Sequence, residues 1–166
     1  SCIHVGISNC LYYRIVWAFP NSYCLNVNFN LVDHTLFKPR ESYTTMDPNV
    51  VSKTVYIYNG SSPGKEHIYG KHIYEQVVQI LSGISEFQFI YSATDRTEHE
   101  NMPNVYIKCC IMLRLTERDG NANSVQECEA MNIPVVHNLS AYGLKWTTIH
   151  DVVNHVLNSA KNISNH

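Results

Sequence analysis

Apolar and polar positions along residues 54–161 predict strands that alternate with helices. Short apolar runs rich in β-branched and aromatic residues predict strands at 54–59, 87–92, 111–116 and 133–136. Apolar positions at helical spacing predict helices at 69–83, 124–131 and 147–161, and a short helix at 102–109. Such alternation is typical of a parallel sheet with helices on both faces, so we predict an α/β fold.

The residues before position 54 follow a different pattern. "IHVGIS" predicts one strand and "NCLYYRIVWAF" one amphipathic helix, which together are too little to form a domain. The stretch 38–53 contains two prolines and little periodicity, and it predicts a linker. We therefore divide the chain into 1–37, the end of a larger domain, a linker at 38–53, and an α/β domain at 54–166.

Composition and charge exclude several classes of protein. The 166 residues are 45% apolar, which is enough for a core, and the net charge of −2 gives no sign of a nucleic-acid-binding surface. No apolar run has the length of a membrane span, and the first residues do not resemble a signal peptide. The six cysteines show no zinc-type spacing, so we expect free thiols and a cytoplasmic protein.

The histidines do not predict a metal site. No two of them form a ligand pair with a third ligand nearby, so we interpret residues such as His99, His150 and His155 as surface or capping residues. His137 differs because it lies at the end of the strand predicted in "IPVVHN", at the edge of the sheet where ligands bind. We predict no metal and no cofactor.

The loop "ERDGNAN" at 117–123 is the strongest candidate for a binding site. It follows a predicted strand, and ligands of open α/β sheets bind beyond the carboxyl ends of the strands. The next helix directs its N-terminus at this place, which suits a phosphate or diphosphate. Gly120 permits close backbone approach, and one of Asn121, Asn123 and Ser124 is expected to cap the helix.

Two acids near this loop call for a different ligand group. Carboxylates bind phosphate poorly, whereas they accept hydrogen bonds well from the paired hydroxyls of sugars and ribose. Asp119 and Glu127 could serve in this way, and we expect neither Glu127 nor the nearby Glu129 to be a core residue. Each residue also has a purely structural interpretation, because Asp-Gly is a common turn and Asn or Ser a common helix cap.

The stretch "RLTERDGNANSVQECEAMNIPVV" resembles the donor-binding signature of retaining GT-B-fold glycosyltransferases (glycosyltransferase group 1, family 4-like). That family carries two acids separated by seven residues, matched by Asp119 and Glu127, before an Ala-Met/Leu-x-x-Pro-Val-Val run. One subgroup reads Arg-x-Thr-x-x-Asp-Gly, matched by Arg114, Thr116, Asp119 and Gly120. The resemblance implies that Glu127 holds the nucleotide ribose and that Asp119 lies near the donor sugar. These two acids are our candidate catalytic residues.

A second segment supports the resemblance. "NFNLVDHTLFKPRE" is similar to the family's segment between its two domains, with Val32, Asp33, Phe37 and Pro39 matching and Leu31 in place of the usual glycine. The resemblance implies a Rossmann-like domain that forms the C-terminal half of a GT-B fold. It also leads us to expect that most of the acceptor domain is absent from this chain.

The chain departs from the family pattern in two places. The family's first donor-domain loop often carries an Arg and a Lys that neutralise the diphosphate, but "NGSSPGKEHIYGK" has no Arg and offers Lys65 as the best lysine. Between positions 92 and 102, only "ATDRTEHEN" stands where the family has a further strand and a base-contacting loop. The predicted donor-binding residues are Gly60, Ser61, Lys65, Arg114, Thr116, Gly120, Asn121, Asn123 and Ser124.

The resemblance implies retaining transfer of a hexosyl group from a nucleotide sugar, such as a UDP- or GDP-sugar, to an unknown glycan or small-molecule acceptor. We expect this chain to be inactive alone, and peripheral membrane association through the absent domain stays open. Two alternatives also stay open: a sugar-nucleotide epimerase of the same architecture, and a non-catalytic α/β binding domain. Nucleotide binding would distinguish a donor domain from a domain that has lost this chemistry.

Overall fold

The computed structural model describes residues 3–6, 15–20, 23–26, 32–43, 46–61, 63–117, 119 and 122–164. Its larger sheet has four parallel strands in the order β4-β3-β5-β6. These strands are β3 (Thr54–Ile57), β4 (Gln88–Tyr91), β5 (Ile111–Leu113) and β6 (Val135–Val136). The all-parallel sheet with helices around it confirms the prediction of an α/β, Rossmann-like fold.

The helices occur where the apolar spacing predicts them, with shifted ends. They are α3 (Lys71–Ile84), α4 (Met102–Tyr106), α5 (Asn123–Ala130) and α6 (Ile149–Ser164). Short 3₁₀ turns, η2 (Glu66–Tyr69) and η3 (His99–Asn101), precede α3 and α4. Between η2 and α3, Gly70 has φ +76°, and a Cβ there would lie 2.6 Å from the carbonyl oxygen of Leu115. The start of α3 therefore packs closely against the chain that leaves β5.

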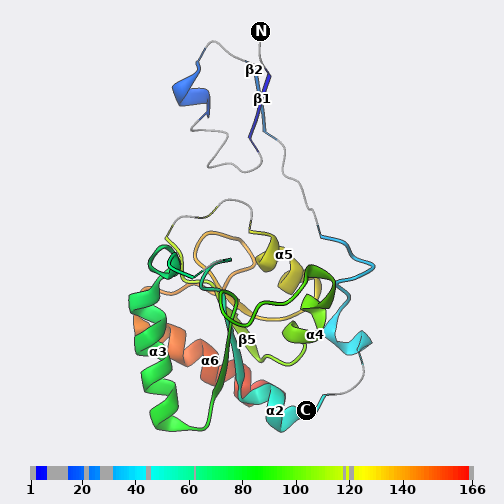
Figure 1. The fold of residues 1–166 in the computed structure, drawn as a ribbon, viewed down its shortest axis with the longest axis vertical. Helices are drawn as coiled ribbons and strands as arrows, with labels where there is room; N and C mark the ends of the chain where they lie inside the picture. Colours follow the sequence, from blue (N-terminus) through cyan, green and yellow to red (C-terminus); the bar gives the residue numbers. More distant parts are fainter. Residues whose placement is uncertain are drawn as a thin grey trace.

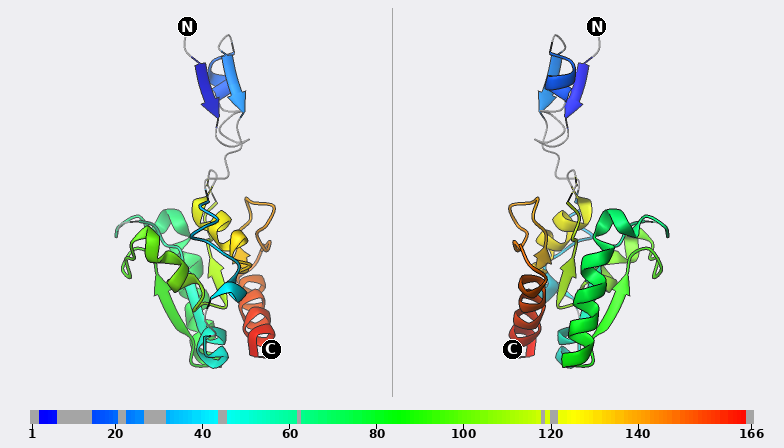
Figure 2. Two further views of the ribbon diagram at one scale, coloured as in Figure 1. Left: turned by 90° about the vertical axis from the view of Figure 1, so that its right-hand side faces the viewer. Right: turned by 90° about the vertical axis from the view of Figure 1, so that its left-hand side faces the viewer.

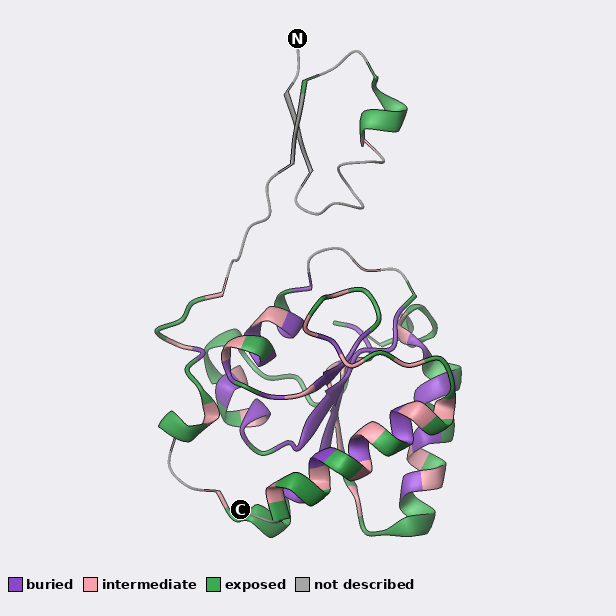
Figure 3. Cartoon of the chain, turned by 180° about the vertical axis from the view of Figure 1, so that it is seen from behind, coloured by how far each residue is buried: buried purple, intermediate pink, exposed green. Residues whose placement is uncertain are grey.

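Successive residues of each strand point to opposite faces of the sheet, which gives the domain two apolar cores. On one face, Val55 and Ile111 pack with α3 and α6. On the other, Tyr56 and Met112 pack with α4 and α5, where Cys128 is fully buried. Figure 1 shows α3 and α6 on one side of β5 and α4 and α5 on the other, and Figure 3 shows the buried strands between them.

The strand order creates a switch point between β3 and β5. The chain leaves β3 through α3 to reach β4 on one side, and then returns through α4 to β5 on the other side of β3. Loops that leave neighbouring strands in opposite directions open a crevice at the carboxyl edge of the sheet. Helix α5 lies at this end of the domain, and the C-terminus lies at the other (Figure 2). The fold therefore places the loops after β3, β4 and β5 together.

The predicted linker at 38–53 is largely folded onto the domain. It contains η1 (Arg40–Ser42) and α2 (Pro48–Ser52), and α2 packs against α6. Just before it, Phe37 is 1% exposed and belongs to the core beneath α4 and α5. The backbone N–H of Arg40 also donates to the carbonyl of Met131. The apolar pattern did not reveal η1 and α2 because these elements are too short to show a helical repeat.

A separate two-stranded parallel sheet forms from β1 (Ile3–Gly6) and β2 (Tyr23–Asn26). The strand β1 agrees with the prediction from "IHVGIS", whereas β2 was not predicted. Of the helix predicted at 9–19, residues 15–18 are helical, Phe19 is not, and 9–14 lie outside the described residues. The division of the chain into domains stays a prediction.

Two further observations bear on the sequence predictions. Cys109, Cys110 and Cys128 are buried free thiols. Cys2 and Cys10 lie outside the described residues, and the side chain of Cys24 is not described. Within the described ranges, no helix combines the length and apolar character needed to cross a membrane.

Candidate functional site

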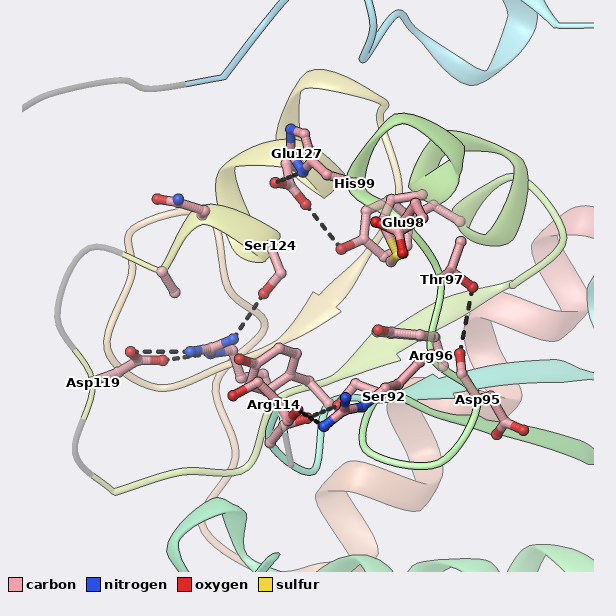
Figure 4. A pocket seen from close by; sticks show the side chains of 18 residues that line it. Ser92, Asp95, Arg96, Thr97, Glu98, His99, Arg114, Asp119, Ser124 and Glu127 are labelled. Atoms are coloured by element: carbon pink, nitrogen blue, oxygen red, sulfur yellow. Dashed lines mark hydrogen bonds and ion pairs between the residues drawn. The ribbon is translucent and has the colours of Figure 1, made fainter. Parts of the chain in front are cut away.

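A cleft of about 680 Å³ opens at the switch point. That volume lies within the range of small-molecule sites, roughly 300–1,000 Å³. The residues that line it come from the ends of β3, β4 and β5, from η3 and α4, and from the first turns of α5 (Figure 4). They are Tyr56, Tyr58, Gly60, Ser61, Ser92, Asp95, Arg96, Thr97, Glu98, His99, Met102, Tyr106, Arg114, Asp119, Ala122, Asn123, Ser124 and Glu127.

Hydrogen bonds join the loops after β3 and β4 into one wall of the cleft. The Ser92 hydroxyl donates to the carbonyl of Gly60 at 2.6 Å and accepts the backbone N–H of Asn59. The buried Asn59 side chain accepts the backbone N–H of Ala93 at 2.9 Å. The Arg96 guanidinium donates to the carbonyl of Ser61 at 2.9 Å, so a cation from the second loop stands over the first.

Arg114 follows β5 directly and organises the opposite wall. Two of its nitrogens donate to both oxygens of Asp119, and a third donates to the Ser124 hydroxyl at 2.8 Å. Its guanidinium carbon lies 3.8 Å from the centre of the Tyr58 ring, a cation–π contact. Arg114 is 6% exposed, so this charge is buried within groups from three segments of the chain.

The electrostatics of this cluster keep the guanidinium charged. Burial lowers the pKa of Arg114, but the hydrogen bonds to Asp119 and its negative charge outweigh burial, and the net shift is upward. His137 lies beneath, with Nδ1 donating to the Arg114 carbonyl at 3.1 Å and Nε2 4.0 Å from Asp119. Burial lowers the pKa of His137, which favours the neutral ring.

Glu127, on the second turn of α5, has different neighbours. The Tyr106 hydroxyl donates to its Oε2 at 2.9 Å, and the Nδ1 of His99 lies 3.7 Å from its Oε1. Burial raises the pKa of this carboxyl, while the Tyr106 hydrogen bond and the charges of His99 and Arg114 partly oppose the shift. Figure 4 shows Glu127 and His99 together, apart from the Arg114–Asp119 pair. The two candidate acids therefore occupy separate places in the cleft.

The structure brings most of the predicted site residues together. The predicted residues that line the cleft are Gly60, Ser61, Arg114, Asp119, Asn123, Ser124 and Glu127. Lys65 is exposed and Thr116 is buried, and neither lines the cleft. Gly120 and Asn121 lie outside the described residues.

Two expectations about α5 are wrong. The N-cap is Ala122, without a side-chain cap, because the helix begins at Asn123 and the Ser124 hydroxyl is engaged by Arg114. Glu127 is buried at 6% exposure, contrary to the expectation that it lies outside the core, because Tyr106 and α4 pack over it. Glu129 is exposed, as expected.

Sequence reasoning missed the contribution of the loop after β4. His99, interpreted as a surface or capping residue, is indeed exposed, but it also lines the cleft beside Glu127. Ser92, Arg96 and Thr97 line the same wall. The signal was available, because "ATDRTEHEN" is a polar loop that follows a predicted strand in a parallel sheet. Tyr106 had no comparable signal, since its role depends on how α4 packs against α5.

The charges along the cleft suit a polar ligand. Among the described lining residues, four acids (Asp95, Glu98, Asp119 and Glu127) accompany two guanidinium groups (Arg96 and Arg114). Within the described part of the chain, no group of three or more His, Cys, Asp or Glu residues is placed to hold a metal ion.

Comparison of the chain with protein-family models finds no match, and comparison with curated proteins finds none either.

Proposed function

We propose that this chain is the donor-binding domain of a retaining GT-B-fold glycosyltransferase, and that the cleft binds a nucleotide-diphospho-sugar. The observation that carries the proposal is the position of Glu127. Glu127 lines the cleft at the switch point and is hydrogen-bonded to the Tyr106 hydroxyl, and its carboxylate can accept hydrogen bonds from a ribose diol. The signature that includes Asp119 and Glu127 supports the same function.

The diphosphate would lie toward the start of α5 and Arg96. Ala122 has no side chain that could accept the first N–H groups of the helix, so these groups suit an anion. Gly60 has φ +112° and lets the backbone of the first loop approach a ligand closely. Arg96, held over Ser61, provides a cation in place of the arginine that the first loop lacks.

In transfer, negative charge develops on the departing diphosphate. Fixed N–H groups and guanidinium groups stabilise such charge without reorganising, which is the main electrostatic contribution to catalysis in many enzymes. Arg114 would act through Asp119 and Ser124 by holding the loop and the start of α5 in place. The acceptor would bind outside the described cleft, so the proposal assigns this chain the donor half of the reaction.

The second candidate is a domain that binds a nucleotide without transferring a sugar. The observation that favours it is that both oxygens of Asp119 are engaged by Arg114, which leaves this carboxylate less available to a donor sugar. The two candidates differ in how the sugar affects affinity, because a donor domain should bind a nucleotide sugar more tightly than the nucleoside diphosphate. A non-catalytic domain should gain nothing from the sugar.

The test is calorimetric titration of the chain with UDP, GDP, ADP and the matching glucose and mannose nucleotides. We expect saturable binding of one nucleoside diphosphate and stronger binding of its sugar conjugate. Binding of the diphosphate with no gain from any sugar would support the second candidate. Absence of binding for the whole panel would contradict both.

A further inference from the structure

Tyr106 links two helices through one buried hydrogen bond. Its hydroxyl, on α4, donates to Oε2 of Glu127 on α5 at 2.9 Å. Both residues are almost completely buried, with 2% of Tyr106 and 6% of Glu127 exposed. A hydrogen bond to a carboxylate in such surroundings is stronger and more directional than one at the surface.

Packing fixes the donor in place. The Tyr106 ring meets Tyr56 edge to face, with the ring centres 5.3 Å apart, and lies 6.3 Å from the ring of Phe37. Tyr56 belongs to β3, so the hydroxyl is positioned relative to the sheet and not only to α4. Aromatic rings held in this way have little freedom to turn. The position of Oε2 is therefore set by the core.

The other carboxylate oxygen faces a more open environment. Oε1 lies 3.7 Å from His99, whose side chain is 64% exposed at the rim of the cleft. With Oε2 engaged by Tyr106, Oε1 is the oxygen on the side of the exposed His99. The hydrogen bond thus determines which carboxylate oxygen faces Tyr106 and which faces His99.

We infer that Tyr106 is a positioning residue, which orients the Glu127 carboxylate so that it can receive the ribose hydroxyls of a bound nucleotide. The inference rests on the proposed function, because it deepens the account of how that site recognises its donor. Tyr106 acts through Glu127, and its removal should weaken recognition of the ribose while leaving recognition of the diphosphate intact.

The pKa of Glu127 provides a second way to test this role of Tyr106. A donor to a carboxylate stabilises its ionised form, so Tyr106 opposes the rise in the Glu127 pKa that burial causes. The other groups that act on Glu127 are His99 from η3, Arg114 at the end of β5 and Cys128 on α5 itself, with Glu98 on the same cleft. All of these remain in a Tyr106→Phe variant, so a change in titration would report the lost hydroxyl.

The chain offers a matched control. The Tyr142 hydroxyl donates to the carbonyl of Ile133 at 2.8 Å, and Tyr142 is not among the residues that line the cleft. Tyr106→Phe and Tyr142→Phe therefore each remove one oxygen and one hydrogen bond without creating a large cavity. Any general loss of stability should appear in both variants, whereas an effect on Glu127 should appear only in the first.

The experiment combines NMR titration of the Glu127 side chain with calorimetry of UDP, GDP, ADP and inorganic diphosphate at pH 5.5 and pH 8. We expect Tyr106→Phe to raise the Glu127 pKa and to weaken binding of the preferred nucleotide by about three- to tenfold at pH 8. The loss should grow at pH 5.5, because more of the variant's carboxyl is then protonated. Inorganic diphosphate should bind both proteins equally, and Tyr142→Phe should match the parent.

Three outcomes would overturn the inference. The first is an unchanged Glu127 pKa together with unchanged nucleotide affinity in Tyr106→Phe. The second is an equal loss in Tyr142→Phe, and the third is an equal loss for inorganic diphosphate. If the parent binds none of UDP, GDP and ADP, the proposed function fails and the ribose role fails with it. The NMR titration distinguishes failure of the proposed function from failure of the inference, because it shows without any ligand whether Tyr106 affects the pKa of Glu127.

Discussion

Asp119 and Glu127 look alike in the sequence, where they are the two acids of one motif, but their surroundings differ. Asp119 is held through both oxygens by the buried guanidinium of Arg114. Glu127 has one neutral donor, Tyr106, and an exposed histidine 3.7 Å away. The first acid is neutralised within the protein and holds a loop in place. The second is buried, and no guanidinium among the described residues is hydrogen-bonded to it, as expected for a group kept for a ligand.

Breaking the Arg114–Asp119 pair should have the largest effect on stability. Arg114→Met leaves the Asp119 carboxylate, whose side chain is only 12% exposed, without its guanidinium. Removal of one member of such a pair costs about 3–5 kcal/mol, and we expect a loss of that size in urea unfolding. Arg96→Met, at an exposed arginine of the same cleft, is the control and should change stability little. Equal losses of stability in the two variants would contradict a special role for the buried pair.

A smaller decrease in stability should follow when the contact between Arg114 and α5 is removed. Ser124→Ala removes the hydroxyl that accepts from Arg114 at 2.8 Å, and hydrogen bonds to charged groups contribute about 1.5–3 kcal/mol. We expect a loss toward the lower end of that range in the same unfolding assay, because water can partly replace the hydroxyl. Ser61→Ala, at an exposed serine of the cleft, should have almost no effect. Unchanged stability of Ser124→Ala would contradict the claim that Arg114 holds the start of α5 in place.

Removal of the Glu127 charge should raise stability, the opposite of the effects expected at Arg114 and Ser124. Burial raises its pKa, so the folded state binds a proton more tightly than the unfolded state, and ionisation of Glu127 lowers stability as the pH rises through that pKa. Glu127→Gln should therefore be more stable than the parent at pH 7.5, and the gain should shrink toward pH 4. Urea midpoints across this range measure it, with Glu129→Gln as the exposed control. A loss of stability at pH 7.5 would mean that Glu127 is a structural residue like Asp119.

The smallest of these effects belongs to His137. Burial lowers its pKa, so the stability that the neutral ring provides is present above the ordinary pKa of about 6.5 and is lost as the pH falls through the lower folded value. His137→Asn keeps an N–H donor for the Arg114 carbonyl and does not titrate. We expect the parent to lose more stability than this variant between pH 7.5 and pH 5. If stability falls equally with pH in the two proteins, titration of His137 does not contribute to the pH dependence.

Much of the fold follows from periodicity alone. The apolar spacing in α3 and α6, and the alternation of Val55 and Tyr56 between the two faces of the sheet, are visible in the sequence. Helix α2 was missed because five residues are too few for a repeat to emerge. A local signal existed, since Asp47 accepts the N–H of Asn49 and Pro48 follows it, the usual start of a helix.

The site was less predictable than the fold. The loop after β5 stood out because its residues lie together in the sequence, and the loop after β4 could have been found by the same rule for parallel strands. The contact of Tyr106 with Glu127 joins residues 21 positions apart, and the contact of Arg114 with Tyr58 joins two strand ends. Such contacts depend on strand order and helix packing, which the apolar pattern does not specify.

The central claim is that Glu127 is kept for the nucleotide ribose, and one measurement tests it most directly. The nucleoside diphosphate that the parent binds best is titrated calorimetrically into the parent, Glu127→Gln and Glu129→Gln. A carboxylate–diol contact contributes on the order of 1.5–3 kcal/mol, so we predict that Glu127→Gln binds roughly ten- to a hundredfold more weakly. Glu129, exposed on the same helix, should match the parent. Equal affinities for the parent and Glu127→Gln would contradict the claim.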